Sequence, residues 1–306
     1  MIDVALPGTG GMMPLPGRWL SCLAVRSGGS GLLFDCGEGT QVALKAISWG
    51  FRDIDALVIS HLHADHISGL VGILLMLGNS GRTAPLRIYG PPGLSAVVAG
   101  QRLLARYLPY RAEVVELWPG EEFAVGDLRA TLALGEHGGA RCYAYRIDLP
   151  RRPRFDPERA RALGLPVAVW RLLQGGEPVE HGGRVVRPEE VLGPPRRGLS
   201  LAYVTDTRPT ERVAVLASGV DLLVSEATFG DPADAARALE TGHMTFAEAG
   251  ELAKRAEARH LLLTHFSPAL ADPPAWREEA ARRFPEVVVG RDGYRTTLRF
   301  EEDEPA

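Results

Sequence analysis

Short apolar runs recur along the chain, and four of them lead directly into a residue that can bind a metal ion or move a proton. The runs and the residues that follow them are 56–60 with His61, 201–205 with Asp206, 221–225 with Glu226, and 261–264 with His265. Apolar runs of this length predict buried strands. Because ligands gather at the carboxyl ends of strands in layered α/β folds, we expect these four side chains to share one site.

Helical patterns lie between these runs, which predicts an α/β fold. Residues 94–108 are amphipathic, and Thr245-Phe246-Ala247-Glu248 forms a capping box that predicts a helix to about residue 258. Residues 150–198 are instead rich in Pro, Gly and Arg, with one short helix predicted after Asp156. We interpret them as an inserted, arm-like segment within a single domain that spans residues 1–306.

The charge is distributed unevenly along the chain. Its 306 residues include 34 Lys and Arg against 38 Asp and Glu, a formal net charge of −4, which argues against a generally basic nucleic-acid binder. Residues 150–200 hold ten arginines and only six acidic residues. This basic segment is either a solvated surface insertion or a landing surface for a polyanion.

Three features bear on the compartment. The apolar run 70–77 is too short to span a bilayer, and the first residues lack the basic and apolar regions of a secretory signal. Cys22, Cys36 and Cys142 are odd in number and widely spaced, so they form neither a disulfide framework nor a CxxC metal site. We therefore expect a cytoplasmic protein with reduced thiols and no membrane association.

The window His61-Leu62-His63-Ala64-Asp65-His66 holds three of the eight histidines in the chain. Residues two apart in an extended loop point the same way, so His61 and His63 can face one ion. Asp65 and His66 turn the chain into the next helix and can face a second ion. Imidazole nitrogen and carboxylate oxygen are zinc ligands, and the spacing differs from the HExxH of a zincin helix. The window predicts a metal site.

This window, placed after an apolar strand, resembles the signature of the metallo-β-lactamase superfamily, and further stretches resemble its ribonuclease Z family. Those stretches are 8–11 with Pro14 and Arg18, 34–41, 135–137, 205–207, 225–229, 243–245 and 263–265. The resemblance covers nearly the whole chain and thins over residues 150–198. It implies an α/β fold built as a four-layered αββα sandwich, with residues 150–198 as its Arg/Pro/Gly-rich insertion.

The resemblance also implies a site with two Zn²⁺ ions per chain. The implied ligands are His61, His63 and His137 for one ion, Asp65, His66 and His265 for the other, and Asp206 as the bridge between them. A shared carboxylate would screen two dications about 3.5–4 Å apart. Nitrogen and oxygen ligands alone do not exclude Mn²⁺ or Fe²⁺. Asp35 and Glu38 are expected to fix the loop beneath the ions.

The implied activity is a zinc-dependent phosphodiesterase that removes the 3′ trailer from precursor tRNA endonucleolytically, using a metal-bound hydroxide. Asp65 would orient the hydroxide, while Glu226 would hold His243 against the phosphate and the leaving oxygen. The family also implies a homodimer in which one subunit's insertion grips RNA at the other's site. Phosphate-binding candidates in this chain are Arg171, Arg196 and Arg197.

Two departures from the family pattern keep other readings open. The stretch 164–176 lacks a central Gly-Pro pair, and Ser267-Pro268-Ala269-Leu270 stands where the family has Ser-x-Arg-Tyr. A metallo-hydrolase of a smaller ester, such as a cyclic nucleotide phosphodiester or a lactone, is the main alternative. A non-enzymatic RNA- or partner-binding module is another, and an inability to take up zinc would favour it. The di-iron redox branch of the superfamily is disfavoured, because it usually has Glu where His63 stands in this chain.

Overall fold

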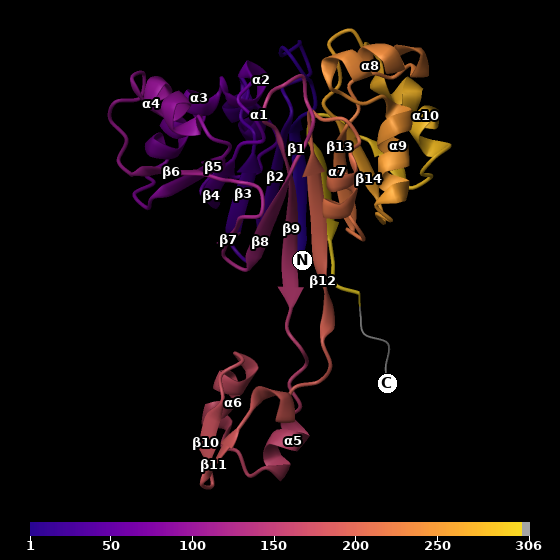
Figure 1. The fold of residues 1–306 in the computed structure, drawn as a ribbon. Coiled ribbons are helices and arrows are strands. Elements are labelled where there is room, and N and C mark those ends of the chain that lie inside the picture. Colours follow the sequence, from indigo (N-terminus) through magenta and orange to yellow (C-terminus); the bar gives the residue numbers. More distant parts are fainter. Residues whose placement is uncertain (302–306) are drawn as a thin grey trace. The chain divides into compact units, whose positions relative to one another are not determined.

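The computed structural model describes residues 1–301, which divide into two compact units. The large unit comprises residues 1–149 and the chain from Leu199 onward, and the small unit comprises Pro150–Gly198. Figure 1 shows the sheets and helices of the large unit and the short elements of the small one. Each unit is described by itself.

The first sheet of the large unit mixes antiparallel and parallel strands. Its seven strands lie in the order β16 (Tyr294–Leu298), β1 (Ile2–Gly8), β2 (Cys22–Ser27), β3 (Ser30–Phe34), β4 (Ile54–Val58), β5 (Leu86–Gly90) and β6 (Ala112–Glu116). Strands β16 to β3 pair antiparallel, whereas β3 to β6 pair in parallel. The carboxyl ends of β3 to β6 therefore share one edge of the sheet.

The second sheet repeats this organisation. Its seven strands lie in the order β15 (Val287–Val289), β14 (Leu261–Thr264), β13 (Leu222–Glu226), β12 (Arg196–Val204), β9 (Tyr143–Arg151), β8 (Leu128–Leu134) and β7 (Glu122–Val125). Strands β12 to β15 pair in parallel, and β7 to β9 pair antiparallel. The four apolar runs expected to form strands thus lie in β4, β12, β13 and β14.

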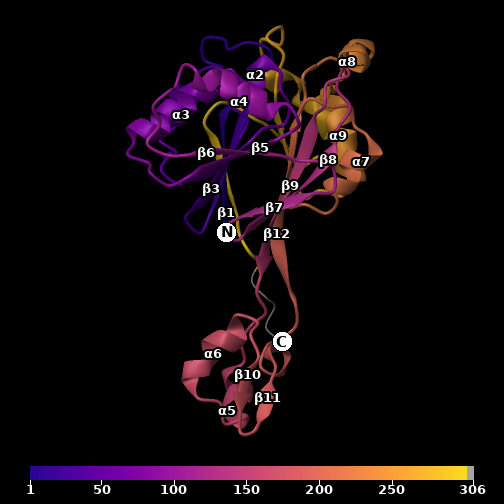
Figure 2. The ribbon, with the colours of Figure 1, turned by 60° about the vertical axis from the view of Figure 1, so that its left-hand side comes forward.

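Three apolar cores show that the large unit has four layers. The core between the sheets joins side chains from both, such as Leu6, Phe34, Tyr203 and Val224. A second core packs the first sheet against α1 (Thr40–Ala46), α3 (Leu70–Asn79) and α4 (Leu94–Arg102). A third packs the second sheet against α7 (Glu211–Leu216), α9 (Phe246–Arg255) and α10 (Arg277–Ala281). The αββα sandwich is therefore confirmed, and Figure 2 shows helices on both outer faces.

The predicted helices differ in how well their ends were placed. At the start of α9 the Thr245 hydroxyl accepts from the Glu248 amide, and the Glu248 carboxylate accepts from the Thr245 amide, so the expected capping box is present. The helix predicted over 94–108 is too long, because α4 ends at Arg102. Leu104 and Tyr107 are exposed beyond it, so the apolar pattern there belongs to surface loop residues and not to a buried helix face.

The shorter helical elements complete the large unit. They are α2 (Ala64–Ile67), η2 (Pro232–Asp234), α8 (Ala235–Thr241) and η3 (Pro273–Trp276). Gly69 lies between α2 and α3. Only glycine fits at this position, because a Cβ there would lie 1.9 Å from the carbonyl oxygen of Gly37. This close approach brings the start of α3 against the loop that follows β3.

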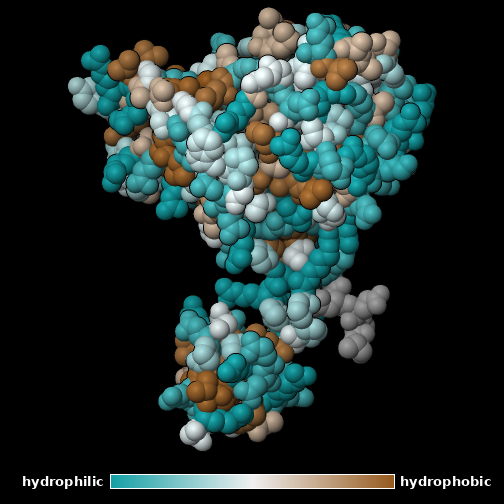
Figure 3. Space-filling view, viewed as in Figure 1, coloured by the Kyte–Doolittle hydropathy of each residue, from teal (hydrophilic) through white to brown (hydrophobic). Residues whose placement is uncertain are grey.

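The small unit has its own minor core. It contains α5 (Pro157–Ala162), α6 (Val167–Gln174), the hairpin of β10 (Val179–His181) and β11 (Arg184–Val186), and η1 (Pro188–Glu190). The Asp156 side chain caps α5, as the sequence predicted, but the expectation of one short helix is wrong because α6 and the β10–β11 hairpin also form. Six buried apolar residues and the Phe155 and Trp170 rings hold these elements together. The hydropathy surface in Figure 3 shows many hydrophilic side chains on this unit.

Two further observations concern the helices and the cysteines. Among residues 1–301 no helix is long and apolar enough to cross a membrane. Cys22, Cys36 and Cys142 are buried free thiols, and burial raises the pKa of Cys142 to about 12, so this thiol stays protonated at neutral pH.

Candidate metal centre

The strand ends of both sheets bring together seven side chains of the types that can bind a metal ion. These side chains form two sets, and within each set the possible ligand atoms all lie within 4.8 Å of one another. One set is His61, His63 and His137, and the other is Asp65, His66, Asp206 and His265. Asp65 and His66 lie in α2, which follows β4, and the other five lie in the loops after β4, β8, β12 and β14. The structure thus gathers every residue that the sequence suggested as a ligand.

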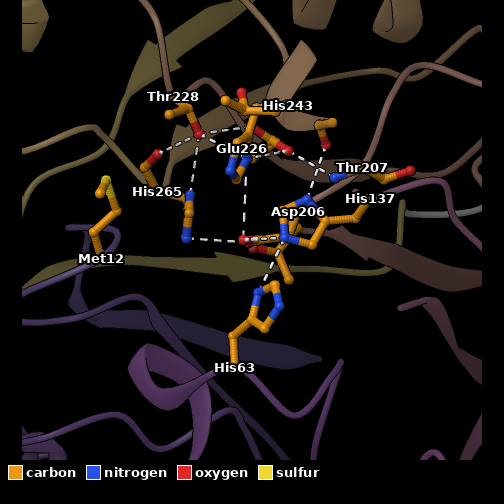
Figure 4. Close-up of polar contacts among 12 residues, drawn as sticks. Met12, His63, His137, Asp206, Thr207, Glu226, Thr228, His243 and His265 are labelled. Carbon is orange, nitrogen blue, oxygen red and sulfur yellow. Dashed lines mark hydrogen bonds and ion pairs between the residues drawn. The ribbon is translucent and has the colours of Figure 1, made fainter. Parts of the chain in front are cut away.

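The Asp206 carboxylate lies between the two sets (Figure 4). Its Oδ2 is 3.7 Å from the Nε2 atoms of both His61 and His137. Its Oδ1 is 3.3 Å from Nε2 of His66 and 3.0 Å from Nε2 of His265. One carboxylate therefore presents a separate oxygen to each set, which is the geometry that a bridging ligand needs.

The remaining ligand atoms have the spacing of groups around one ion. In the first set, Nδ1 of His63 is 3.1 Å from Nε2 of His137. In the second, Oδ2 of Asp65 is 3.5 Å from Nε2 of His66 and 3.6 Å from Nε2 of His265. Two ligands each about 2.0–2.2 Å from a tetrahedral zinc ion lie roughly 3.3–3.6 Å apart. The donor atoms fit one ion per set.

The imidazole rings are oriented from behind by their other nitrogens. Nδ1 of His66 donates to Asp35 at 2.9 Å, and Nδ1 of His137 donates to the Gly242 carbonyl at 3.1 Å. Nε2 of His61, His66 and His265 is buried without a hydrogen-bond partner among the described residues. A buried polar atom without a partner costs free energy. A metal ion bound by the lone pairs of these Nε2 atoms would remove that cost, so the arrangement fits a metal site.

Asp35 lies at the centre of this support. Its carboxylate accepts from the Ser60 amide and hydroxyl, each at 2.8 Å, and from the Tyr203 hydroxyl at 3.1 Å, in addition to His66. Because the Ser60 hydroxyl donates to Asp35, its oxygen can accept from Nδ1 of His61 at 3.0 Å. Asp35 thus orients histidines of both sets, whereas Glu38 is exposed.

Three residues after strand ends adopt a backbone conformation that favours glycine. Asp35 has φ +57°, Asp206 has φ +46° and His265 has φ +59°. Left-handed backbone at non-glycine residues is strained and concentrates at functional sites. Here it turns one orienting carboxylate and two candidate ligands into the centre.

Buried charges determine the protonation of the cluster. Burial raises the pKa of Asp206, but the imidazoles of His265 and His66 outweigh it and hold that pKa well below its ordinary value. Burial lowers the pKa of His66, but Asp206 and Asp35 raise it well above its ordinary value. The carboxylates that attract a proton to His66 also attract a cation, so a metal ion can replace that proton.

Glu226 and His243 form a second pair beside the ligands. Both carboxylate oxygens of Glu226 are 3.2 Å from Nδ1 of His243. Glu226 also accepts from the Thr207 amide and the Thr228 hydroxyl at 2.7 Å. Burial lowers the pKa of His243, but the charge and hydrogen bonds of Glu226 raise it to about 9. Glu226 therefore favours the protonated form of His243.

Arg208 is a positioning residue that the sequence did not single out. Its guanidinium donates to the His243 carbonyl and to the Glu248 carboxylate, and its amide donates to the Glu136 carbonyl at 2.9 Å. It thereby joins the loops that carry Asp206, His137 and His243. Thr228 was also missed as a contact residue, although its hydroxyl lies 3.1 Å from Nδ1 of His265.

Asp65 receives a hydrogen bond from the N-terminal loop. The Met12 amide donates to its Oδ2 at 2.7 Å, and Met12 itself has a left-handed backbone with φ +65°. Gly11 allows this approach, because a Cβ there would lie 2.6 Å from the His265 ring. The glycine-rich start of the chain is thus part of the centre.

The three arginines suggested for phosphate binding lie in the small unit. Arg171 is on α6 and is exposed, and Arg196 and Arg197 begin β12. Their role in substrate binding stays a prediction.

Comparisons with known proteins agree with this geometry. A family model described as the metallo-beta-lactamase superfamily matches residues 20–194, and one described as a beta-lactamase superfamily domain matches residues 178–266. A protein of Lachnoclostridium phytofermentans named Ribonuclease Z is 43% identical over 99% of this chain and 100% of its own. A second Ribonuclease Z, from Lachnospira eligens, is 42% identical over 99% of this chain and 100% of its own.

Solved structures agree on the fold. The metallo-beta-lactamase fold protein YhfI from Bacillus subtilis has a TM-score of 0.69 at 24% identity, covering 96% of this chain and 98% of its own. The short form of human tRNase Z has a TM-score of 0.67 at 24% identity, covering 97% of this chain and 100% of its own. With full-length relatives above 40% identity, the chain belongs to the ribonuclease Z family of the metallo-β-lactamase superfamily, whose members are metal-dependent hydrolases.

Proposed function

We propose that this protein is an endonuclease that removes the 3′ trailer from precursor tRNA. The observation that carries the proposal is the Asp206 carboxylate, with one oxygen toward each of two ligand sets and the Glu226–His243 pair beside it. Two-metal sites of this kind suit in-line displacement at phosphorus. The substrate follows from the full-length relatives named Ribonuclease Z.

We propose two Zn²⁺ ions per chain as the native metal. His61, His63 and His137 would hold one ion, and Asp65, His66 and His265 the other, with Asp206 shared. When bound, the two ions would activate a water molecule and neutralise charge on the phosphate. Mn²⁺ and Fe²⁺ bind similar donors, so metal analysis of the purified protein decides among the three.

Asp65 is the residue that we assign to the attacking water. Its Oδ2 lies in the second ligand set, and the Met12 amide holds the carboxylate in place. A carboxylate fixed there can orient a water molecule and accept its proton as the oxygen attacks phosphorus. The scissile bond is the one between phosphorus and O3′ of the tRNA, so the products are a tRNA 3′-hydroxyl and a trailer 5′-phosphate.

His243 is the residue that we assign to the leaving oxygen. Its Nδ1 is held by Glu226, which leaves Nε2 for the substrate. Because Glu226 raises the pKa of His243, it favours the protonated ring, which can donate to O3′ as the bond breaks. The Glu226 carboxylate, which itself accepts from Thr207 and Thr228, fixes the ring in the orientation that this transfer needs.

The test is cleavage of a 3′-extended precursor tRNA by zinc-loaded protein. We expect one cut beside the discriminator base and a 3′-hydroxyl on the tRNA product. Asp65→Ala should lose this activity, whereas His260→Ala, which removes an exposed histidine outside the ligand sets, should keep it. Hydrolysis of a simple phosphodiester without a cut in the precursor would move the substrate to a smaller ester and overturn the proposal.

Two further parts of the proposal concern assembly and compartment. We propose a homodimer in the cytoplasm, with the arginines of the small unit contacting tRNA bound for cleavage. The basic surplus of residues 150–200 supports this role, since phosphate contacts dominate nucleic-acid affinity. Light scattering tests the dimer. Replacing Arg171, Arg196 and Arg197 by Ala should raise KM for precursor tRNA and flatten its salt dependence.

A further inference from the structure

The exposed side of the metal centre leads to an aromatic surface. His63 is the exposed member of the first ligand set, and its Nδ1 lies 3.1 Å from Nε2 of His137. His137 belongs to a tight turn closed by a bridge to Ala140, and the next residue, Arg141, is exposed. The turn that supplies a candidate ligand therefore also presents a guanidinium to solvent.

That guanidinium lies over a tryptophan from another loop. Cζ of Arg141 is 4.8 Å from the centroid of the Trp118 ring, and the Trp118 residue is 53% exposed. Trp118 follows β6, whose carboxyl end lies at the same sheet edge as the end of β4 that carries His61. Trp118 and Arg141 together are named the Trp118 platform below.

The platform has a fixed base. The Tyr143 hydroxyl donates to the Leu117 carbonyl at 2.8 Å, and the Trp118 amide donates to the Glu121 carboxylate at 2.7 Å. Tyr143 is fully buried, so the loop starts from a rigid part of the sandwich. A held aromatic ring loses little conformational freedom when a flat ligand stacks on it.

A groove continues from the platform at Pro119, the residue after Trp118. It has a volume of about 420 Å³, and its walls include Leu132, Leu134 and Val215 together with Arg212. Glu211 also lines the groove, but its carboxylate pairs with Arg255 at 2.7 Å. The surface that continues from the His137–Arg141 turn thus combines a half-exposed indole under the Arg141 guanidinium with apolar walls and Arg212.

We propose that the Trp118 platform stacks an unpaired nucleotide of the RNA substrate next to the cleaved phosphodiester. The inference rests on the proposed function, because an RNA cut beside its paired stem presents unpaired bases on either side of the cut. Aromatic rings bind any base through its π-face, and an arginine beside the ring contacts the neighbouring phosphate. The platform would therefore hold the strand without selecting its sequence.

The test compares Trp118→Ala and Trp118→Phe in the zinc-loaded protein, using precursor tRNA and bis(p-nitrophenyl) phosphate as substrates. Loss of one base–aromatic stack is expected to raise KM for the precursor about tenfold in Trp118→Ala, and Trp118→Phe should recover most of this loss. The kcat for hydrolysis of the small diester should stay unchanged, because both variants keep the ligand sets that would hydrolyse it. Arg141→Ala should raise KM for the precursor and weaken its salt dependence.

Two controls make the result specific. Tyr107→Ala removes a ring that is 94% exposed and follows α4, and it should leave both activities unchanged. A precursor with abasic residues beside the cleavage site should be cut equally by wild type and Trp118→Ala. An unchanged KM for the intact precursor in Trp118→Ala would overturn the platform alone. A wild-type protein that hydrolyses the diester but leaves the precursor intact would overturn the proposed function and the platform with it.

Discussion

The two ligand sets of the metal centre differ in charge and in exposure. The set of His61, His63 and His137 consists of imidazoles, and His63 is exposed. The other set combines His66 and His265 with the carboxylates of Asp65 and Asp206, and no member is exposed. Asp206 presents an oxygen to both sets, so Asp65 is the anionic donor that distinguishes them. A carboxylate attracts a dication more strongly than a neutral imidazole does. The comparison teaches that charge separates the two sets, and it predicts that the second set holds its ion more tightly than the first.

Removing the shared carboxylate should have the largest effect, because it weakens both sets. Asp206→Ala is expected to lower kcat/KM by more than about a thousandfold, since the charge stabilisation of a two-metal site amounts to several kcal/mol. Metal analysis should find that both ions are lost after dialysis. Retention of two ions per chain with strong activity would show that Asp206 does not bridge the sets.

Asp65→Asn should separate the two sets. It removes one anion from the second set while leaving the first set intact, and it removes the group assigned to the attacking water. We expect activity to fall about 10²- to 10⁴-fold, the usual contribution of a general base. Chelator titration supplies the comparison, because in wild type the imidazole set should lose its ion first. In Asp65→Asn the second set should lose its ion as early as the first. If the second set still keeps its ion longer, the charge of Asp65 does not distinguish the sets.

Asp35→Asn tests the support behind both sets. Loss of an orienting carboxylate usually costs about 10- to 100-fold in metal affinity. The effect should be larger at the second set, where Asp35 contacts His66 directly, than at the first, which it reaches through Ser60. Competition with a fluorescent zinc chelator measures both affinities. Asp55→Asn is the matched control, because the Asp55 carboxylate accepts a hydrogen bond from the Gly31 amide within the sheet. This variant should change neither metal affinity.

Arg208→Met should have the smallest effect, and it should leave the metal in place. Arg208 fixes the His243 carbonyl without contacting the ligand atoms, so we expect kcat to fall about tenfold, with unchanged metal content, as positioning is lost. Arg255→Met is the matched control, because it breaks a surface ion pair with Glu211. A loss of bound metal in Arg208→Met would assign Arg208 a role in the ligand sets.

Short-range signals in the sequence predicted the strand ends and the 61–66 metal site, whereas the four layers and the full candidate ligand set followed from the resemblance to the metallo-β-lactamase superfamily. Strands β4, β12, β13 and β14 each end beside a polar residue, and a strand end has a defined place in a layered sheet. The supporting contacts are different, since Tyr203 and Asp35 are 168 residues apart and meet only in the folded chain. The end of α4 was misplaced for a related reason, because Leu104 is apolar and yet exposed.

The carboxylate of Glu248 has a consequence for heat resistance. It closes the first turn of α9 through Thr245 and also binds Arg208, which holds the His243 carbonyl. Helix ends fray before a domain unfolds, so opening of this one turn would free His243 while the sheets remain paired. Thermal inactivation should therefore begin below the melting temperature of the fold, and the two temperatures should converge if the N-terminus of α9 is stabilised.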